Sequence, residues 1–349
     1  MKSLDFDDLD DEEGAALARG DEVITGVQLH NNQWELGTVL EPMKRSKALP
    51  SDDMLPEAVR KTLPQGKEVV ERTIKLRVLI FYGAGDSVMM SWAQMHHDAP
   101  PELELATVEM RGHGIRKDED LLKTLDDVAN DAFEASKDGM DTGKFAIIGH
   151  SIGCLVAISV AKRAKTELNV EPLYAIMLER GAPQHAVLSS FGQDMLHNDL
   201  ITFLDNYGGF VGKAYRSGTK DGLYGGKMWQ HDMELDQDTR EVGWFTLSCP
   251  ILAVRGMKNV WVDPDAKLDP ETRKVVDLHS KMRVSGKPWN FERSMFQDWE
   301  LWTSHPDGCR VLEVDADHFG VKISPEVRKA VWEALRKAAV PGPPKTSMD

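Results

Sequence analysis

From residue 75 onward, short runs of apolar residues alternate with longer segments in which apolar residues recur every three or four positions. The short runs predict buried β-strands, and the longer segments predict amphipathic helices. Strands and helices that alternate at this spacing are typical of an α/β protein with a doubly wound, mostly parallel sheet. The expected strands span residues 76–82, 103–109, 145–148, 173–178, 250–254 and 311–314, and the expected helices include 121–136, the segment from 153 to about 165, and 325–338.

Two long segments interrupt this alternation. Residues 185–246 separate the fourth and fifth strands and are too long for a simple connection. They contain helical patches at 191–203 and 226–241 around a glycine-rich centre, which predicts either a lid over an active site or a plain helical insertion. Residues 264–308 form a second insertion, rich in Trp, Asp and Lys, for which the pattern indicates no purpose.

The remaining segments complete the expected domain organisation. We expect residues 1–25 to form a disordered acidic leader, because the first 22 residues hold nine acidic and only two basic side chains. Residues 26–72 mix short apolar groups with prolines and are expected to form an extension packed on the main domain, which spans 73–339. Residues 340–349, rich in proline and polar residues, predict a disordered tail.

Composition narrows the function classes. A formal net charge of −15 over 349 residues makes a nucleic-acid partner unfavourable. No stretch approaches the ~20 apolar residues of a membrane span, and the acidic first residues do not resemble an export signal. Cys154, Cys249 and Cys309 are widely spaced and form neither a zinc pattern nor a disulfide framework, so we expect a reducing, cytoplasmic location.

The residues with the clearest chemistry lie at 149–153, Gly-His-Ser-Ile-Gly, between an apolar strand and a helical segment. A G-x-S-x-G sequence in this context predicts a nucleophile elbow, in which Ser151 occupies a strained turn from strand to helix. The flanking glycines permit the following helix to pack close to the strand before it. The sequence therefore predicts that Ser151 is a nucleophile.

A serine hydroxyl needs a neighbouring base, and in this arrangement the histidine follows the last strand. His318 lies four residues beyond the strand at 311–314 and is the expected base. The acid is expected after the fifth strand, where Asp263 is our first candidate. Asn259 occupies the usual position of the acid, and Glu179, at the end of the fourth strand, is another alternative.

Acyl transfer also requires hydrogen-bond donors for the oxyanion that forms on the substrate. One expected donor is the backbone N–H of Ile152, directly after the nucleophile. The other is expected in the small-residue turn after the first strand, from the backbone N–H of Gly83 or Ala84. The alternative is that these small residues only make a tight turn.

Several motifs occur in a consistent order along the chain. They are the turn at 81–85 followed by Trp92, the turn at 110–114, the leucine-rich segment 121–135, the elbow at 149–153, Arg180 with Ala182 and Pro183, the Cys-Pro-Ile sequence at 249–251, and Asp317-His318-Phe319. In this order they resemble the type II thioesterases that accompany polyketide and nonribosomal peptide synthases, which are α/β-hydrolases. The resemblance covers residues 75–262 and 310–337, and it departs from the family at Lys258-Asn259, where paired acids are usual.

The resemblance implies hydrolysis of acyl thioesters held on the phosphopantetheine arm of an acyl carrier protein in polyketide, nonribosomal peptide or fatty acid synthesis. It implies no cofactor and no metal. Because such carriers are acidic, the net negative charge of this chain disfavours docking unless a basic patch such as Lys162, Arg163 and Lys165 faces the carrier. The simpler interpretation of these three residues is a solvated helix face. Two alternatives remain: a carboxylesterase or lipase acting on free esters, and a non-catalytic binding protein with a hydrolase fold.

Overall fold

In the computed structural model, six parallel strands form one sheet in the order β2-β1-β3-β4-β5-β6. The strands are β1 (Leu76–Phe81), β2 (Leu103–Thr107), β3 (Phe145–His150), β4 (Ala175–Leu178), β5 (Ile251–Gly256) and β6 (Cys309–Val314). All six strands that the apolar runs predict are confirmed, and their ends shift by at most two residues.

The structure describes residues 74–87, 92, 95–96, 98–140, 143–185, 188, 190–207, 210–237, 242–258 and 293–339. The expected leader (1–25), extension (26–72) and tail (340–349), and residues 264–292 of the second insertion, lie outside these ranges.

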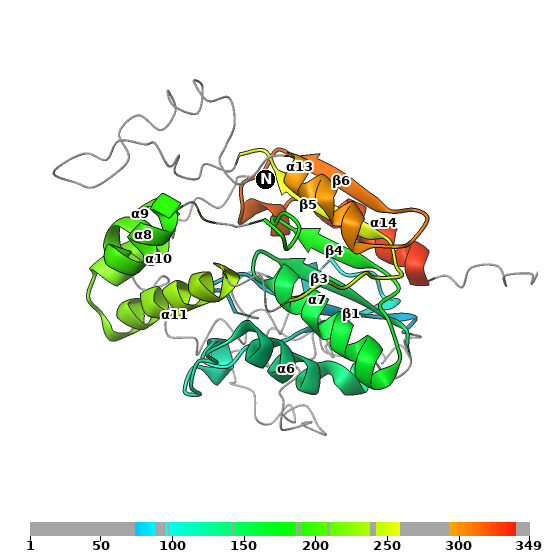
Figure 1. Ribbon diagram of the computed structural model, residues 1–349, viewed down its shortest axis with the longest axis horizontal. Helices are drawn as coiled ribbons and strands as arrows, with labels where there is room; N and C mark the ends of the chain where they lie inside the picture. The colour runs from blue at the N-terminus through cyan, green and yellow to red at the C-terminus, as the bar shows by residue number, and fades with distance from the viewer. Residues whose placement is uncertain are drawn as a thin grey trace, which may run out of the picture.

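The strand order reverses between β1 and β3, because β2 lies on one side of β1 and β3 to β6 follow on the other. At such a switch point the loops after neighbouring strands diverge and leave a crevice beyond the carboxyl ends of the strands. Figure 1 shows the helices that connect the strands packed around the sheet. The loops after β1 and β3 therefore border the crevice in which a ligand would bind.

Helices cover the sheet as the amphipathic segments predict. α6 (Leu125–Ser136) and α7 (Gly153–Arg163) pack against each other, and α14 (Pro325–Ala339) contacts β1 and β5. α6 begins four residues later than expected, because the Thr124 hydroxyl accepts a hydrogen bond from the N–H of Asp127 and caps the helix there. Short elements complete this part: η3 (Gly114–Arg116), η4 (Lys137–Gly139), η5 (Ala164–Leu168), α13 (Arg293–Gln297), η7 (Asp298–Trp302) and η8 (Gly320–Lys322). No helix in the described ranges combines the length and apolarity that a bilayer crossing requires.

The segment between β4 and β5 forms helices that lie together to one side of the sheet (Figure 1). They are α8 (Ser190–Asn198), α9 (Leu200–Tyr207), α10 (Phe210–Arg216) and α11 (Lys220–Gln237). The glycine-rich centre contributes residues to α10 and α11. A Cβ at Gly222 would collide with the carbonyl of Ala214, and one at Gly226 with the ring of Tyr215, so these glycines permit close packing of α10 on α11.

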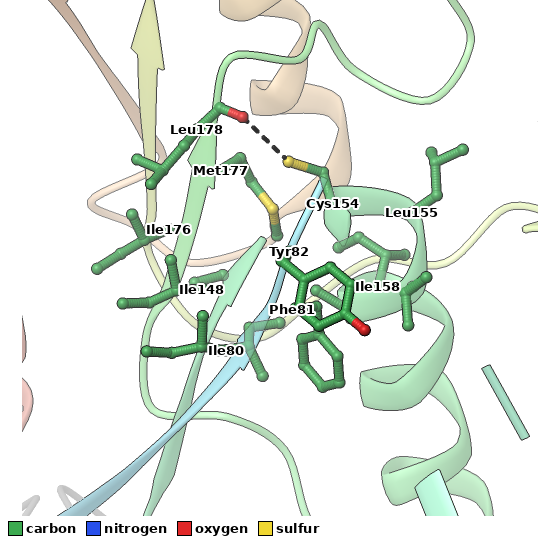
Figure 2. Close-up of a cluster of buried hydrophobic side chains, with 14 of the residues drawn as sticks. Ile80, Phe81, Tyr82, Ile148, Cys154, Leu155, Ile158, Ile176, Met177 and Leu178 are labelled. Atoms are coloured by element: carbon green, nitrogen blue, oxygen red, sulfur yellow. Dashed lines mark hydrogen bonds between the residues drawn. The ribbon is translucent and has the colours of Figure 1, made fainter. Parts of the chain in front are cut away.

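The core lies between the sheet and the helices. Figure 2 shows Phe81 of β1 and Met177 of β4 on the side of the sheet that carries Cys154, Leu155 and Ile158 of α7, whereas Ile80, Ile148 and Ile176 project to the other side. Cys154 is fully buried, and its Sγ lies 3.6 Å from the carbonyl of Leu178. Burial raises the pKa of this thiol, so Cys154 acts as a small packing residue at the base of the elbow.

The two glycines of the elbow allow the backbone contacts on which this packing depends. A Cβ at Gly149 would lie 2.5 Å from Cα of Cys154, in the first turn of α7. One at Gly153 would collide with the carbonyl of Phe81, at the end of β1. Contacts this short are absent from real Cβ atoms, so a side chain at either position forces α7 away from the sheet.

We predict that Gly153→Ala lowers the free energy of unfolding by about 2 kcal/mol, because the new methyl group meets backbone that cannot rotate aside. Equilibrium denaturant unfolding measures the change. Gly225→Ala is the matched control: it lies in α11 with open space around it and should raise stability by about 0.5–1 kcal/mol. Equal stability of Gly153→Ala and the unmodified protein would contradict the close contact.

Candidate active site

Ser151 lies at the carboxyl end of β3 with a left-handed backbone conformation (φ 53°). Its N–H donates to the carbonyl of Leu178 at 3.0 Å, and its own carbonyl accepts from the N–H of Cys154 at 2.9 Å. Only three non-glycine residues in the described ranges have positive φ, and such strain persists where surrounding contacts fix the backbone. The elbow predicted from the Gly-x-Ser-x-Gly sequence is therefore present in the backbone.

The turn after β1 lies directly against the elbow. A Cβ added at Gly83 would lie 3.1 Å from Cβ of Ser151, and the N–H of Asp86 closes the turn by donating to the Gly83 carbonyl at 3.2 Å. Ile152, next to the serine, caps the N-terminus of α7, where backbone N–H groups point out of the helix. The predicted oxyanion donors, on Ile152 and on Gly83 or Ala84, thus flank the serine.

One pocket contains the serine, the histidine and this turn. The space between these residues is about 260 Å³, a volume that includes the open solvent at the mouth of the pocket. Its lining residues are Gly83, Ala84, Asp86, His150, Ser151, Trp229, Met233, His318 and Phe319. The structure therefore brings together Ser151 and His318, which are separated by 167 positions in the sequence.

Glu179 lies behind the imidazole of His318. Its Oε2 is 3.5 Å from Nδ1 of His318, and its Oε1 accepts a hydrogen bond from the backbone N–H of Gly256. The side chain is fully buried, and the residue has a left-handed backbone (φ 57°) immediately after β4. A strained, buried carboxylate directed at a histidine is the geometry of a triad acid.

The other two acid candidates, Asp263 and Asn259, lie outside the described residues. The chain order Ser151, Glu179, His318 keeps the order of nucleophile, acid and base that α/β-hydrolases have. Among the described residues, Glu179 is the candidate that the structure brings to the histidine.

α11 covers the pocket with one face. Trp229 and Met233 of this face line the pocket, and Asp232 and Asp236 are buried beside them. Residues at positions i, i+3, i+4 and i+7 share one side of a helix, so these four form a continuous stripe. The sequence pattern gave no sign of this face, because two of its four members are carboxylates.

The two carboxylates bind different parts of the main domain. Asp236 pairs with buried Arg180 at 3.0 Å, one residue beyond Glu179. Asp232 accepts from the backbone N–H of Gly85 at 2.8 Å, in the turn after β1. α11 is therefore attached to the two loops that carry the candidate acid and the candidate oxyanion donor.

Asp232 also lies between two histidines. Its Oδ2 is 2.9 Å from Nε2 of His113, and its Oδ1 is 3.2 Å from Nδ1 of His231. The second ring nitrogen of each histidine lies near a backbone carbonyl, that of Arg111 at 2.9 Å and that of Leu122 at 2.7 Å. A carbonyl and a carboxylate both accept, so each ring donates from both nitrogens and is a cation.

The pKa directions agree with this geometry. Burial lowers the pKa of both histidines, but the charge and hydrogen bonds of Asp232 outweigh it, and the net pKa of His113 and of His231 is raised. Burial opposes ionisation of Asp232, but His113 and His231 hold its pKa well below the usual range. The sequence signalled only a turn at 111–114 and did not indicate the partner 119 positions away.

The basic residues expected to face an acidic partner are placed elsewhere. Lys162 and Arg163 lie in the last turn of α7, about 16 Å of helix away from Ser151. Arg163 pairs with Asp126 at 2.7 Å, and Lys165 pairs with Glu171 at 2.6 Å. Lys162, Arg163 and Lys165 therefore lie away from the mouth of the site, which favours the solvated helix face over the alternative of a basic patch beside the pocket.

Comparisons with known proteins place this geometry in context. Residues 78–215 match the family model of the Thioesterase domain. The chain is 28% identical over 117 residues to the gramicidin S biosynthesis protein GrsT of Aneurinibacillus migulanus. It is 28% identical over 116 residues to the medium-chain S-acyl fatty acid synthase thioesterase of Homo sapiens. Each alignment covers 33% of this chain, and they span 44% and 42% of those relatives, respectively.

Among solved structures, the chain is similar to YbtT, a type II thioesterase from the yersiniabactin NRPS/PKS biosynthetic pathway, with a TM-score of 0.58. The match has 14% sequence identity and covers 77% of this chain and 96% of YbtT. The predicted α/β-hydrolase fold is confirmed, and the resemblance to thioesterases is confirmed over residues 78–215.

We predict that Asp232→Asn lowers the free energy of unfolding by about 3 kcal/mol, because it leaves buried His113 and its neighbour His231 without their counter-charge. The raised pKa values of the two histidines contribute to the free energy of unfolding. This contribution is complete below pH 6.5, the pKa of a histidine in the unfolded chain, and it is lost as the pH rises through the pKa values of the folded protein. The lowered pKa of Asp232 also contributes to the free energy of unfolding. This second contribution is complete above pH 3.8, the pKa of the carboxyl in the unfolded chain, and it is lost as the pH falls.

Denaturant unfolding of both proteins as a function of pH should therefore show the largest difference between about pH 4 and about pH 6.5. Asp221→Asn, at an exposed position of the same helix, is the control and should change stability by less than about 0.5 kcal/mol. A difference that does not vary with pH would contradict the charged cluster.

Proposed function

We propose that this protein is a serine thioesterase that hydrolyses acyl thioesters held on an acyl carrier protein of polyketide, nonribosomal peptide or fatty acid synthesis. The observation that carries the proposal is the convergence of Ser151, His318 and the Gly83–Ala84 turn on one pocket. The match of residues 78–215 to the Thioesterase domain supports the choice of a thioester over other acyl compounds.

In the proposed first step, Nε2 of His318 takes the proton of the Ser151 hydroxyl, and the oxygen attacks the thioester carbonyl. The oxyanion that forms is stabilised by the N–H of Ile152 and an N–H of the Gly83–Ala84 turn. The carbon–sulfur bond then breaks, and the imidazolium gives its proton to the departing thiolate. The products are an acyl ester on Ser151 and the free thiol of the carrier.

In the second step the same imidazole takes a proton from water, which attacks the acyl ester. Collapse of the second oxyanion releases the carboxylic acid and returns the proton to Ser151. We assign the acid role to Glu179, whose carboxylate lies 3.5 Å from Nδ1 of His318 and stabilises the imidazolium by its charge. Neither step requires a metal or a cofactor.

We assign a lid role to the helices between β4 and β5. Trp229 and Met233 of α11 line the pocket together with Ser151, and an apolar lining limits the access of bulk water to the thioester before Ser151 attacks it. The three free cysteines favour a cytoplasmic reaction, where thiols stay reduced.

We predict that Ser151→Ala lowers turnover of an acyl-carrier thioester by at least about 10⁴-fold, because the nucleophile is removed while the fold is kept. Release of the carrier thiol measures turnover. A fluorophosphonate probe should label the unmodified protein and fail to label the variant.

The same assay distinguishes the candidate functions by comparing turnover of the acyl-carrier thioester with turnover of a free ester. Preference for a p-nitrophenyl ester over the acyl-carrier thioester by orders of magnitude would replace the thioesterase with a free-ester hydrolase. Absence of both turnover and probe labelling in the unmodified protein would leave a non-catalytic hydrolase-fold protein.

We predict that Glu179→Gln lowers kcat by roughly 10³–10⁴-fold, because a neutral amide cannot stabilise the imidazolium. The change keeps the size of the side chain and its acceptor for the N–H of Gly256. Asp263→Asn and Asn259→Ala are the matched controls and should stay within about threefold of the unmodified kcat. A large loss in Asp263→Asn with little loss in Glu179→Gln would move the acid role to Asp263.

A further inference from the structure

His150, the residue before the nucleophile, has no part in the chemistry above. It is buried at 1% exposure, and its Nε2 lies 2.8 Å from the backbone carbonyl oxygen of His318. A carbonyl can only accept a hydrogen bond, so Nε2 of His150 carries the proton and donates. The side chain beside the nucleophile is therefore bonded to the backbone of the candidate base.

The other ring nitrogen faces no acceptor for a second proton among the described residues. Nδ1 of His150 is buried and has no hydrogen-bond partner among the described residues. It lies against the turn after β1, where a Cβ at Gly83 would be 2.6 Å away. Burial, and then the charges of Lys322 and His318, lower the pKa of His150 well below its usual value. His150 is therefore a neutral imidazole with a fixed tautomer.

The surroundings hold this ring in one orientation. Its centroid is 4.8 Å from that of His318 and 6.4 Å from that of Trp92, which meets it edge-on. A ring that is enclosed by two aromatic neighbours and donates one hydrogen bond cannot rotate without breaking that bond. The contact joins the end of β3 to the loop after β6, across the intervening strands β4 and β5.

We propose that His150 is a positioning residue, whose Nε2–H holds the backbone carbonyl of His318 and so places the imidazole of His318 at Ser151. The proposal rests on the proposed catalytic role of His318. A neutral donor suits this position, because His318 becomes a cation during each step and a charged neighbour 4.8 Å away would repel it. The alternative is that His150 only fills space in the core.

Two variants separate donation from packing. The side-chain amide of Gln places an N–H near the position of Nε2, whereas Met has a similar reach and no donor. We predict that His150→Met lowers kcat about 100-fold with KM changed less than about twofold, since a misplaced catalytic group costs turnover and not binding. His150→Gln should retain kcat within about fivefold of the unmodified protein.

The measurement is steady-state turnover of the acyl-carrier thioester, with thermal unfolding as a check that each variant is folded. Unchanged kcat in a folded His150→Met, or equal losses in His150→Met and His150→Gln, would overturn the proposal. Loss of turnover in Ser151→Ala, measured alongside, reports on the proposed function separately.

The tautomer of His150 can be tested without turnover. Two-dimensional ¹H–¹⁵N NMR of the imidazole rings in the unmodified protein should show His150 protonated at Nε2 alone from about pH 5 to about pH 8. A ring protonated at Nδ1, or one that gains a second proton within this range, would overturn the proposal even if the protein proved to be catalytically inactive. This measurement also decides the matter if the variants do not fold.

Discussion

The contact between the first turn of α7 and the end of β1 determines the geometry of the whole site. It brings two backbones so close together that position 153 must be a glycine, because any side chain there would overlap the carbonyl of Phe81. The same approach turns the chain sharply at Ser151 and lays the small-residue turn at Gly83 against the serine. The nucleophile and the donors beside it are thus held by main-chain packing, which varies less than side-chain rotamers do.

The helix above this pocket is attached by a different kind of interaction. Asp232 and Asp236 of α11 are both buried, and each meets a basic side chain of the main domain. Buried ion pairs add less stability than apolar packing of the same size, because each charge must lose its water. They do, however, define a single position, since a small displacement leaves a charge unpaired. These ion pairs thus fix the position of α11 over the pocket more than they add to the stability of the protein.

Local patterns in the sequence predicted what local forces determine. The strands followed from apolar runs, and the elbow followed from glycines whose role is to permit close backbone contact. His318 followed from chain order alone. The sequence pattern did not predict contacts between distant segments, because nothing in the local sequence identifies the partner of a buried carboxylate. His113 and Asp232, for example, are 119 positions apart. Glu179 remained one acid candidate among three for the same reason, and the glycine-rich pattern did not indicate that glycines of α11 permit close packing of α10.

The spacing of Asp232 and Asp236, one turn apart on α11, has a consequence for protein engineering. Exchanging the segment between β4 and β5 for the corresponding part of another hydrolase would remove both carboxylates and leave the buried side chains of Arg180 and His113 without these partners. A chimera that folds must therefore change Arg180 and His113 together with the helix that replaces α11, so that no buried charge is left unpaired. Alternatively, Arg180, His113, Asp232 and Asp236 can all be replaced by uncharged side chains of matching volume. The segment is continuous in the sequence, but its two buried carboxylates pair with side chains that lie outside it.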